Sequence, residues 1–198
     1  MADTPYQSAA AIRAAVTDLE DEGLFPDALI QSLVAEFEEV AEEYRGVAFT
    51  TRSVTAEYHV CIGGPVRLYH PKLRSVSSVA VTYSPAGSAT ALVSSQYTVD
   101  NENGIVVYGF PSGATTAVSY VHGFDSPPNV IIRACRQYVR ACAKSDVSGV
   151  SRDVVAQSSD GFYTRYSTPD RSMGRPTGYV EVDRLLNSAP QYRTPLVA

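Results

Sequence analysis

The period of the hydrophobic pattern changes twice along this chain, and few folds satisfy both changes. Residues 27–44 place apolar side chains at spacings of three and four, which is typical of an amphipathic helix. Residues 47–125 are instead rich in β-branched and aromatic residues with alternating polarity, which indicates strands. Helical spacing returns over residues 129–144. These changes predict an α+β fold in which an antiparallel β block separates N-terminal helices from a long amphipathic helix.

Two helices are expected before the β block. One covers residues 5–20 and the other residues 27–44, and Gly23 and Gly46 follow them as stop signals. Within the β block, residues 101–104 are expected to connect two strands as a hairpin. We divide the chain into segments 1–45, 46–126 and 127–198, and expect the first and third to form one structural unit.

The third segment is expected to continue beyond its long helix with smaller elements. Asp160-Gly161 is typical of a type I′ turn and predicts a C-terminal hairpin around it. Residues 179–189 are expected to form a short helix. Residues 190–198 hold two prolines, so they are expected to form an extended tail that is either unstructured or docked on a partner.

Charge is distributed unevenly along the chain, whose net charge is −5. Residues 1–43 hold 11 acidic residues and one basic residue, whereas residues 44–198 hold 10 acidic and 15 basic residues. The two parts should attract each other, within one chain or between copies. The helix at 27–44 carries an acidic line, Glu36, Glu39 and Glu43. The helix at 129–144 carries a basic stripe opposite its apolar side, Arg133, Arg136, Arg140 and Lys144.

The sequence has none of the motifs that mark common enzyme or cofactor sites. It lacks a phosphate-binding loop, a GxGxxG fingerprint and a GxSxG nucleophile elbow. His122 and Asp125 can be drawn into a triad with a serine, but these residue types are common at strand ends. Asp100, Glu102 and Asp125 lack the spacing of a cation-binding loop. We therefore expect no enzyme, no metal and no cofactor.

The cysteines and the apolar runs limit the class of protein further. The cysteine count of three argues against a disulfide framework. Cys135 and Cys142 lie on the apolar side of the helix at 129–144, where they are expected to be free and buried. No apolar run approaches the roughly 20 residues that cross a bilayer, and the first residues do not have the pattern of a secretory signal. No membrane contact is expected.

A series of short motifs, in a fixed order, runs through the C-terminal half. The chain reads Tyr97-Thr-Val-Asp100, then Asn103-Gly-Ile-Val-Val-Tyr108, then Val118-Ser-Tyr-Val-His-Gly123. After a proline pair and the helix at 129–144 it ends with Thr177-Gly178-Tyr179-Val180-Glu181-Val182-Asp183-Arg184-Leu185-Leu186. Over residues 95–187, this order resembles the head-to-tail adaptor (connector) proteins of long-tailed bacteriophages.

The resemblance implies a structural virion protein located at the head–tail neck and assembled in the bacterial cytoplasm. Members of the family form a ring, usually a dodecamer, that docks under the portal protein and extends the DNA channel. The ring offers a platform for a stopper or tail-terminator protein. The expected partners are therefore copies of the same chain, the portal, the stopper or terminator, and channel DNA through non-specific contact.

A ring needs two different complementary surfaces on each subunit. The acidic line and the basic stripe are the expected pair for subunit or portal contacts, and a position facing the DNA channel is the alternative for the basic stripe. In the tail, Tyr192, Arg193 and Leu196 are expected to dock on the portal or on a neighbouring subunit.

Two other functional classes stay open at this point. One is a different neck or tail-completion component, such as a stopper. The other is a β-rich binding module for sugar or protein, which predicts a monomer with an exposed aromatic patch.

Overall fold

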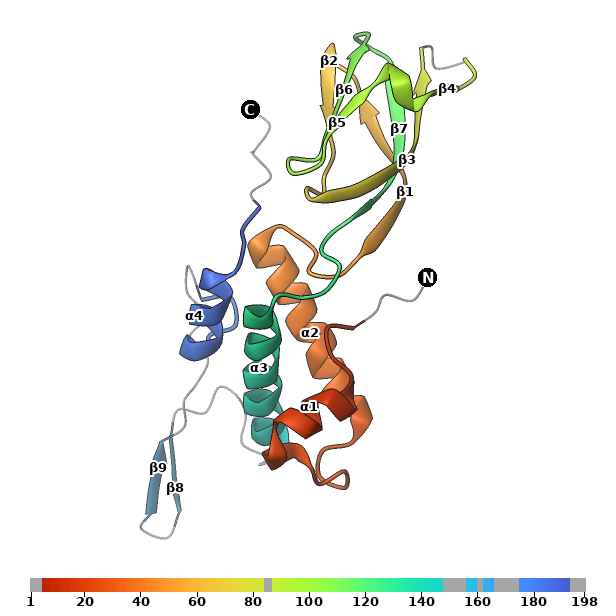
Figure 1. The fold of residues 1–198 in the computed structure, drawn as a ribbon. Coiled ribbons are helices and arrows are strands. Elements are labelled where there is room, and N and C mark those ends of the chain that lie inside the picture. Colours follow the sequence, from red (N-terminus) through yellow and green to blue (C-terminus); the bar gives the residue numbers. More distant parts are fainter. Residues whose placement is uncertain (1–4, 84–86, 148–155, 160–161, 166–174, 193–198) are drawn as a thin grey trace. The chain divides into compact units, whose positions relative to one another are not determined.

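The computed structural model describes residues 5–83, 87–147, 156–159, 162–165 and 175–192 (Figure 1). The chain forms two compact units. The helical unit contains residues 5–45 and 127–190. The β unit contains residues 46–126 together with Gln191 and Tyr192, although the sequence analysis had grouped these last two residues with the third segment. Helices and antiparallel strands are both present, so the predicted α+β class is confirmed.

The described part of the helical unit contains four α-helices, one 3₁₀ helix and one hairpin. The helices are α1 (Ala9–Ala15), the 3₁₀ helix η1 (Thr17–Leu19), α2 (Asp27–Arg45), α3 (Asn129–Val147) and α4 (Val180–Ser188). The hairpin pairs β8 (Ala156–Ser159) with β9 (Phe162–Arg165) in antiparallel register. The predicted C-terminal hairpin is therefore confirmed, whereas its Asp160-Gly161 turn lies outside the described residues.

The first predicted helix, over residues 5–20, is wrong in its extent. The α-helix starts after Ser8, whose side-chain oxygen accepts a hydrogen bond from the Ala11 amide at 3.2 Å. It ends at Val16, whose backbone has φ −131° and ψ 87°. Val16 and Thr17 are successive β-branched residues, which are weak helix formers. The chain then turns into η1, and this turn gives Asp18 its position.

The core of the helical unit forms where α3 packs against both α2 and α4 (Figure 1). The rings of Phe37 and Tyr138 join α2 to α3, with centroids 5.6 Å apart. Cys135 and Cys142 are free and buried, as the sequence predicted. Burial, with Glu38 close by, raises the pKa of the Cys135 thiol to about 12, so this thiol is protonated at neutral pH.

A buried carboxylate fixes the start of α4. Asp183 is 2% exposed, and its Oδ1 accepts hydrogen bonds from the Thr177 amide at 3.0 Å and from the Thr177 hydroxyl at 2.7 Å. The Thr177 hydroxyl oxygen in turn accepts a bond from the Tyr179 amide at 3.2 Å. Gly178, between them, has a φ of +79°, a conformation that favours glycine. These bonds satisfy donors at the N-terminal end of the helix.

The β unit contains two sheets. Sheet A has the strand order β1 (Arg52–Val60), β7 (Thr115–His122), β3 (Leu73–Thr82) and β4 (Thr90–Leu92). Sheet B has the order β2 (Gly64–Arg67), β6 (Ile105–Phe110) and β5 (Thr98–Asp100). The short 3₁₀ helix η2 (Ser94–Gln96) lies between β4 and β5. All strand pairs are antiparallel, and residues 101–104 connect β5 to β6 as predicted.

The two sheets share one apolar core. Strand β7 alternates between half-buried and buried side chains along its whole length. Its buried Val118 packs in one cluster with Val79 and Val81 of β3 and with Val106 and Phe110 of β6. The alternation leaves the opposite side of sheet A without a covering layer in the described part of the β unit.

The two ends of segment 46–126 are hydrogen-bonded to each other. The Phe124 amide donates to the carbonyl of Ala48 at 3.2 Å, and the Thr51 hydroxyl donates to the carbonyl of Phe124 at 3.1 Å. Gly123 has a φ of +92°, and a Cβ added to it would lie 2.2 Å from the carbonyl oxygen of Thr50. Only glycine allows the two ends to approach this closely.

Candidate assembly surfaces

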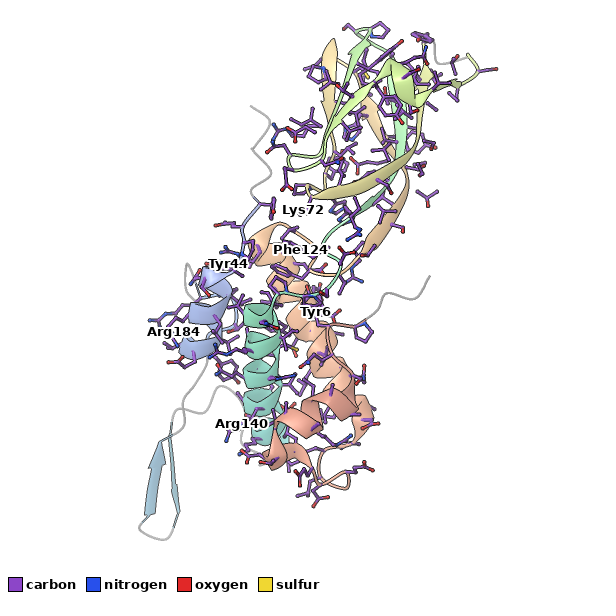
Figure 2. All side chains as sticks on the ribbon, in the orientation of Figure 1. Tyr6, Tyr44, Lys72, Phe124, Arg140 and Arg184 are labelled. Atoms are coloured by element: carbon purple, nitrogen blue, oxygen red, sulfur yellow. The ribbon has the colours of Figure 1, made fainter. Side chains whose placement is uncertain are left out.

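The basic stripe of α3 contacts the N-terminal part of its own chain. Arg136 Nε donates to Gln7 Oε1 at 2.8 Å. Arg140 Nε and Lys144 Nζ both donate to Asp18 Oδ2, at 2.8 Å and 2.5 Å. Figure 2 shows Arg140 on α3 near the end of the helix that lies beside α1 and η1. Within the chain the acidic partner of Arg140 and Lys144 is therefore Asp18 of η1. The pairing of the stripe with the acidic line of α2 in subunit or portal contacts stays a prediction.

Asp18 is held by two cations at once. The hydrogen bonds from Lys144 and then from Arg140 lower the pKa of its carboxyl below the ordinary value of 3.8. All three side chains are solvent-accessible, so salt screens their attraction and the stabilisation is small. The contact orients η1 against α3 and leaves further hydrogen-bonding capacity on both cations.

The exposed face of α3 lies between two hollows. One, of about 310 Å³, lies between α3 and residues 15–18, and Arg133 and Arg140 line it. The other, of about 560 Å³, lies between α3 and the start of α4, where Val180 is exposed. Arg133 is exposed on the same face. The face therefore combines basic side chains with two concave strips.

The predicted acidic line does not form one continuous surface. Glu36 is half-buried, and its Oε1 accepts a hydrogen bond from the Tyr138 hydroxyl at 2.6 Å. Burial, followed by this bond, raises the pKa of Tyr138. Glu36 thus contributes to the packing of α2 on α3, whereas Glu39 and Glu43 are exposed. A role for these two carboxylates in a subunit contact stays a prediction.

The first residues of the predicted tail lie against the β unit. The Tyr192 ring packs edge-on to Phe124, with centroids 6.2 Å apart, and Lys72 Nζ lies 5.8 Å from the centre of the Tyr192 ring. A Cβ added to Gly46 would lie 2.2 Å from the Tyr192 carbonyl oxygen. Figure 2 shows Lys72 and Phe124 in this part of the β unit. Arg193 and Leu196, the other two docking residues predicted in the tail, lie outside the described residues.

The sequence analysis did not identify a buried carboxylate in the β unit. Glu57 is 7% exposed, although it lies in the strand β1. Its Oε1 accepts bonds from the Tyr69 amide at 2.8 Å and from His59 Nε2 at 2.5 Å, and its Oε2 accepts from the Tyr120 hydroxyl. Burial, followed by this last bond, raises the pKa of Tyr120. The arrangement satisfies a buried acid from three sides.

A β-bulge gives Glu57 its inward direction. The register between β1 and β7 shifts between Val54 and Glu57, and Ala56 in this interval has a φ of +58°. A bulge changes which face of a sheet the next side chain points to. A positive φ is unfavourable for alanine, so this backbone stores strain next to the buried acid.

The residues considered for a triad or a cation site have other partners. His122 is buried and stacks on His70 at 4.3 Å, while Asp125 pairs with Arg74, which lowers the Asp125 pKa. Glu102 pairs with Lys72 at 2.7 Å. Among the described residues, no group of three or more His, Cys, Asp or Glu side chains is placed to hold a metal ion. The helices described here are all too short or too polar to cross a membrane.

The motifs that carry the family resemblance have structural roles here. Asp100 accepts bonds from the Asn103 amide at 3.1 Å and from its side-chain Nδ2 at 2.7 Å, and these bonds lower the Asp100 pKa. Gly104 has a φ of +66°, and an added Cβ would lie 2.9 Å from the carbonyl oxygen of His70. Like the bonds from Thr177 to Asp183, these contacts shape turns and helix ends.

A row of exposed apolar side chains follows one side of β1. Tyr58, Val60 and Ile62 are 66%, 74% and 88% exposed. Tyr58 and Val60 alternate with the inward-pointing residues of β1, so both lie on the outer side of sheet A, and Ile62 follows two residues after the end of the strand. Apolar side chains that are exposed next to one another often mark a site of contact with another molecule.

Comparison with known proteins extends the fold assignment. No protein-family model matches the sequence, and no curated protein matches it. The fold is similar to that of a chain in a solved structure described as the neck of an empty GTA particle computed with C6 symmetry. The TM-score is 0.56, the sequence identity is 14%, and the match covers 93% of this chain and 89% of that chain. The two chains therefore share a fold over almost their whole length.

Proposed function

We propose that this chain is a structural protein of a phage-like particle neck, where its copies form an adaptor ring between the portal and the stopper or tail. The observation that carries the proposal is the fold similarity to a chain from a GTA particle neck, which extends over 93% of the residues. The motif order over residues 95–187 supports the same assignment independently, because it was identified from the sequence alone.

The surfaces of the chain support an assembly role. An adaptor has to contact copies of itself and unlike proteins above and below it, so it needs several different surfaces. The described residues offer a basic face with two hollows on α3, exposed carboxylates at Glu39 and Glu43, and an uncharged row on β1. A position facing the DNA channel remains the alternative for the basic stripe, Arg133, Arg136, Arg140 and Lys144.

The proposal is tested by mass measurement and imaging of the purified protein, alone and mixed with its candidate portal protein. We expect either closed rings of the protein alone or an additional ring on the portal, seen by negative-stain electron microscopy and native mass spectrometry. A ring only in the presence of the portal would mean that assembly is coupled to docking.

Monomers under both conditions would contradict the adaptor proposal. A protein that stays monomeric but binds an assembled neck at its tail-facing end would fit a stopper. A monomer that binds sugar or peptide through the β unit would fit a binding module. A charge reversal at Arg133, compared with one at the exposed Arg184, tests whether the exposed basic face of α3 takes part in docking.

A further inference from the structure

The edges of the two sheets in the β unit differ in how they are protected. Natural proteins block exposed strand edges with charged residues, prolines or bulges. In sheet B, the edge strand β2 contains Pro65 and Arg67, and the other edge strand β5 contains Asp100. Both edges of sheet B are therefore protected against pairing with another chain.

In sheet A this protection is confined to the first part of β1, which holds Arg52, the inward-pointing Glu57 and a bulge. The edge strand β1 has its bulge at residues 54–57, and the stretch 58–62 that follows has no charged residue and no proline. The opposite edge strand β4 consists of Thr90, Ala91 and Leu92. The two stretches without charges, prolines or bulges, the end of β1 from Tyr58 and the strand β4, thus lie at opposite edges of one sheet.

One row of paired residues crosses the outer side of sheet A from edge to edge without a charged side chain. Tyr58 of β1 pairs with Ala117 of β7, which pairs with Ala80 of β3, which pairs with Ala91 of β4. This row runs from a large aromatic side chain at one edge to small side chains at the other. Val93, directly after β4, is 61% exposed. The β1 edge therefore carries large outward side chains, whereas the outward side chain of β4, Ala91, is small.

Charged side chains of the β unit form ion pairs with one another. Residues 46–126 contain four acidic and four basic residues, so the segment is neutral. Lys72 pairs with Glu102, Arg74 pairs with Asp125, and Glu57 is bonded to His59. A contact through this unit therefore depends on apolar burial and main-chain hydrogen bonds, and copies do not repel each other.

We infer that the β units of neighbouring copies join edge to edge, with β1 of one copy beside β4 of the next, so that sheet A continues from subunit to subunit. This inference rests on the proposed ring and names the surfaces that form it. Strands β1 and β4 run in opposite directions within sheet A, so β4 followed by the next copy's β1 keeps the antiparallel order. The contact uses two different surfaces of each copy, which is the head-to-tail kind that closes a ring.

Paired cysteine substitutions test this contact. Val60→Cys and Ala91→Cys place thiols on the outer side of the two edges, and neighbouring strands bring such positions within disulfide reach. The double variant should give a ladder of disulfide-linked species up to the full ring under mild oxidation. A mixture of the two single variants should give linked dimers, whereas each single variant alone should not. Tyr58→Cys and Ile62→Cys, each with Ala91→Cys, cover neighbouring registers.

Matched controls separate contact from random collision. The wild type controls for its three native cysteines, which are buried. Val107→Cys with Ala91→Cys places an exposed thiol on β6, in the middle of sheet B, and should give no ladder. Val60→Arg should abolish the ring while the circular dichroism spectrum of the monomer stays unchanged, and Val107→Arg should leave the ring intact.

Three results would overturn the inference. Rings that form normally with Val60→Arg, and that give no ladder with any outer-side pair, would place the subunit contact elsewhere and leave the adaptor function intact. Linked dimers from Val60→Cys alone would indicate a two-fold contact instead of a head-to-tail one. Wild-type protein that forms no ring, alone or on the portal, would overturn the proposed function as well, and the mass measurement would reveal this before any cross-linking.

Discussion

The helical unit and the β unit distribute their charges in opposite ways. Residues 5–45 of the helical unit hold ten acidic and two basic residues, whereas α3 has a basic face at the surface. The β unit is neutral over residues 46–126 and keeps the carboxylate of Glu57 in its interior. Contacts made by the helical unit should therefore depend on salt, while contacts made by the β unit should depend little on it.

This difference suggests a division of tasks within one chain. Electrostatic surfaces favour orientation and selective docking, whereas uncharged strand edges favour permanent association. In the ring that we propose, the two kinds of contact would then lie on different units of each subunit. The comparison can be tested at the level of single residues.

The largest expected effect tests whether the helical unit and the β unit unfold independently of each other. Phe37→Ala removes a fully buried ring that contacts Tyr6 and Tyr138, and should lower the free energy of unfolding of the helical unit by about 3–5 kcal/mol. Hydrogen exchange followed by mass spectrometry should show faster exchange in α2 and α3 and unchanged exchange in β3 and β7. Phe110→Ala should give the reverse pattern. Equal acceleration in both units from either variant would show that they unfold together.

The next effect concerns the buried acid of the β unit. Glu57→Gln places an amide where three donors converge, so donors face donors, and should cost about 1–3 kcal/mol in denaturant unfolding. Tyr120→Phe removes only one of these hydrogen bonds and should cost about 1 kcal/mol. The double variant should cost less than the sum. Additive costs would mean that Glu57 and Tyr120 do not stabilise each other.

A smaller effect of opposite sign is expected at the bulge. Ala56→Gly relieves a positive φ and should raise the free energy of unfolding by up to about 1 kcal/mol. Ala117→Gly, in the regular part of the neighbouring strand β7, should lower it by about 0.5–1 kcal/mol. Thermal unfolding of the two variants measures the difference. Destabilisation by both substitutions to a similar extent would indicate that the bulge is not strained.

The smallest effect concerns the surface charges of the helical unit. Asp18 has a lowered pKa in the folded chain, so its contribution to stability is present above the unfolded-state value of 3.8 and is lost as the pH falls through the lower folded value. Asp18→Asn should lower the melting temperature slightly at pH 7 and low salt, and the difference should vanish in high salt and in strong acid. A difference that persists under those two conditions would show that η1 is held by packing instead.

The sequence predicted those elements whose signals are local. The apolar spacing of α2 and α3, the strand alternation before Gly123, and the motif from Thr177 to Leu186 each reflect contacts within one element or with its nearest turn. The end of α1 at Val16 was missed because apolar residues continue at helical spacing to Leu19. Fold class and element order therefore followed from periodicity alone.

The contacts between distant residues could not be predicted in this way. Asp18 meets Arg140 across 122 positions of sequence, and Glu57 meets Tyr120 across 63. The charge pattern correctly suggested that the basic stripe has an acidic partner, but several acidic clusters were equally suitable. In the same way, the outward direction of Tyr58 and Val60 depends on a bulge that the sequence does not mark.

The paired ends of segment 46–126 have a consequence for how such chains diversify. Ala48 and Phe124 are joined by a hydrogen bond, so segment 46–126 begins and ends at neighbouring residues, as a tight loop does. Gln191 and Tyr192 join the β unit separately, after α4. Segment 46–126 is thus a long insertion between α2 and α3 whose first and last residues lie next to each other. An insertion whose ends meet in this way can change in length or content with little effect on the elements that flank it.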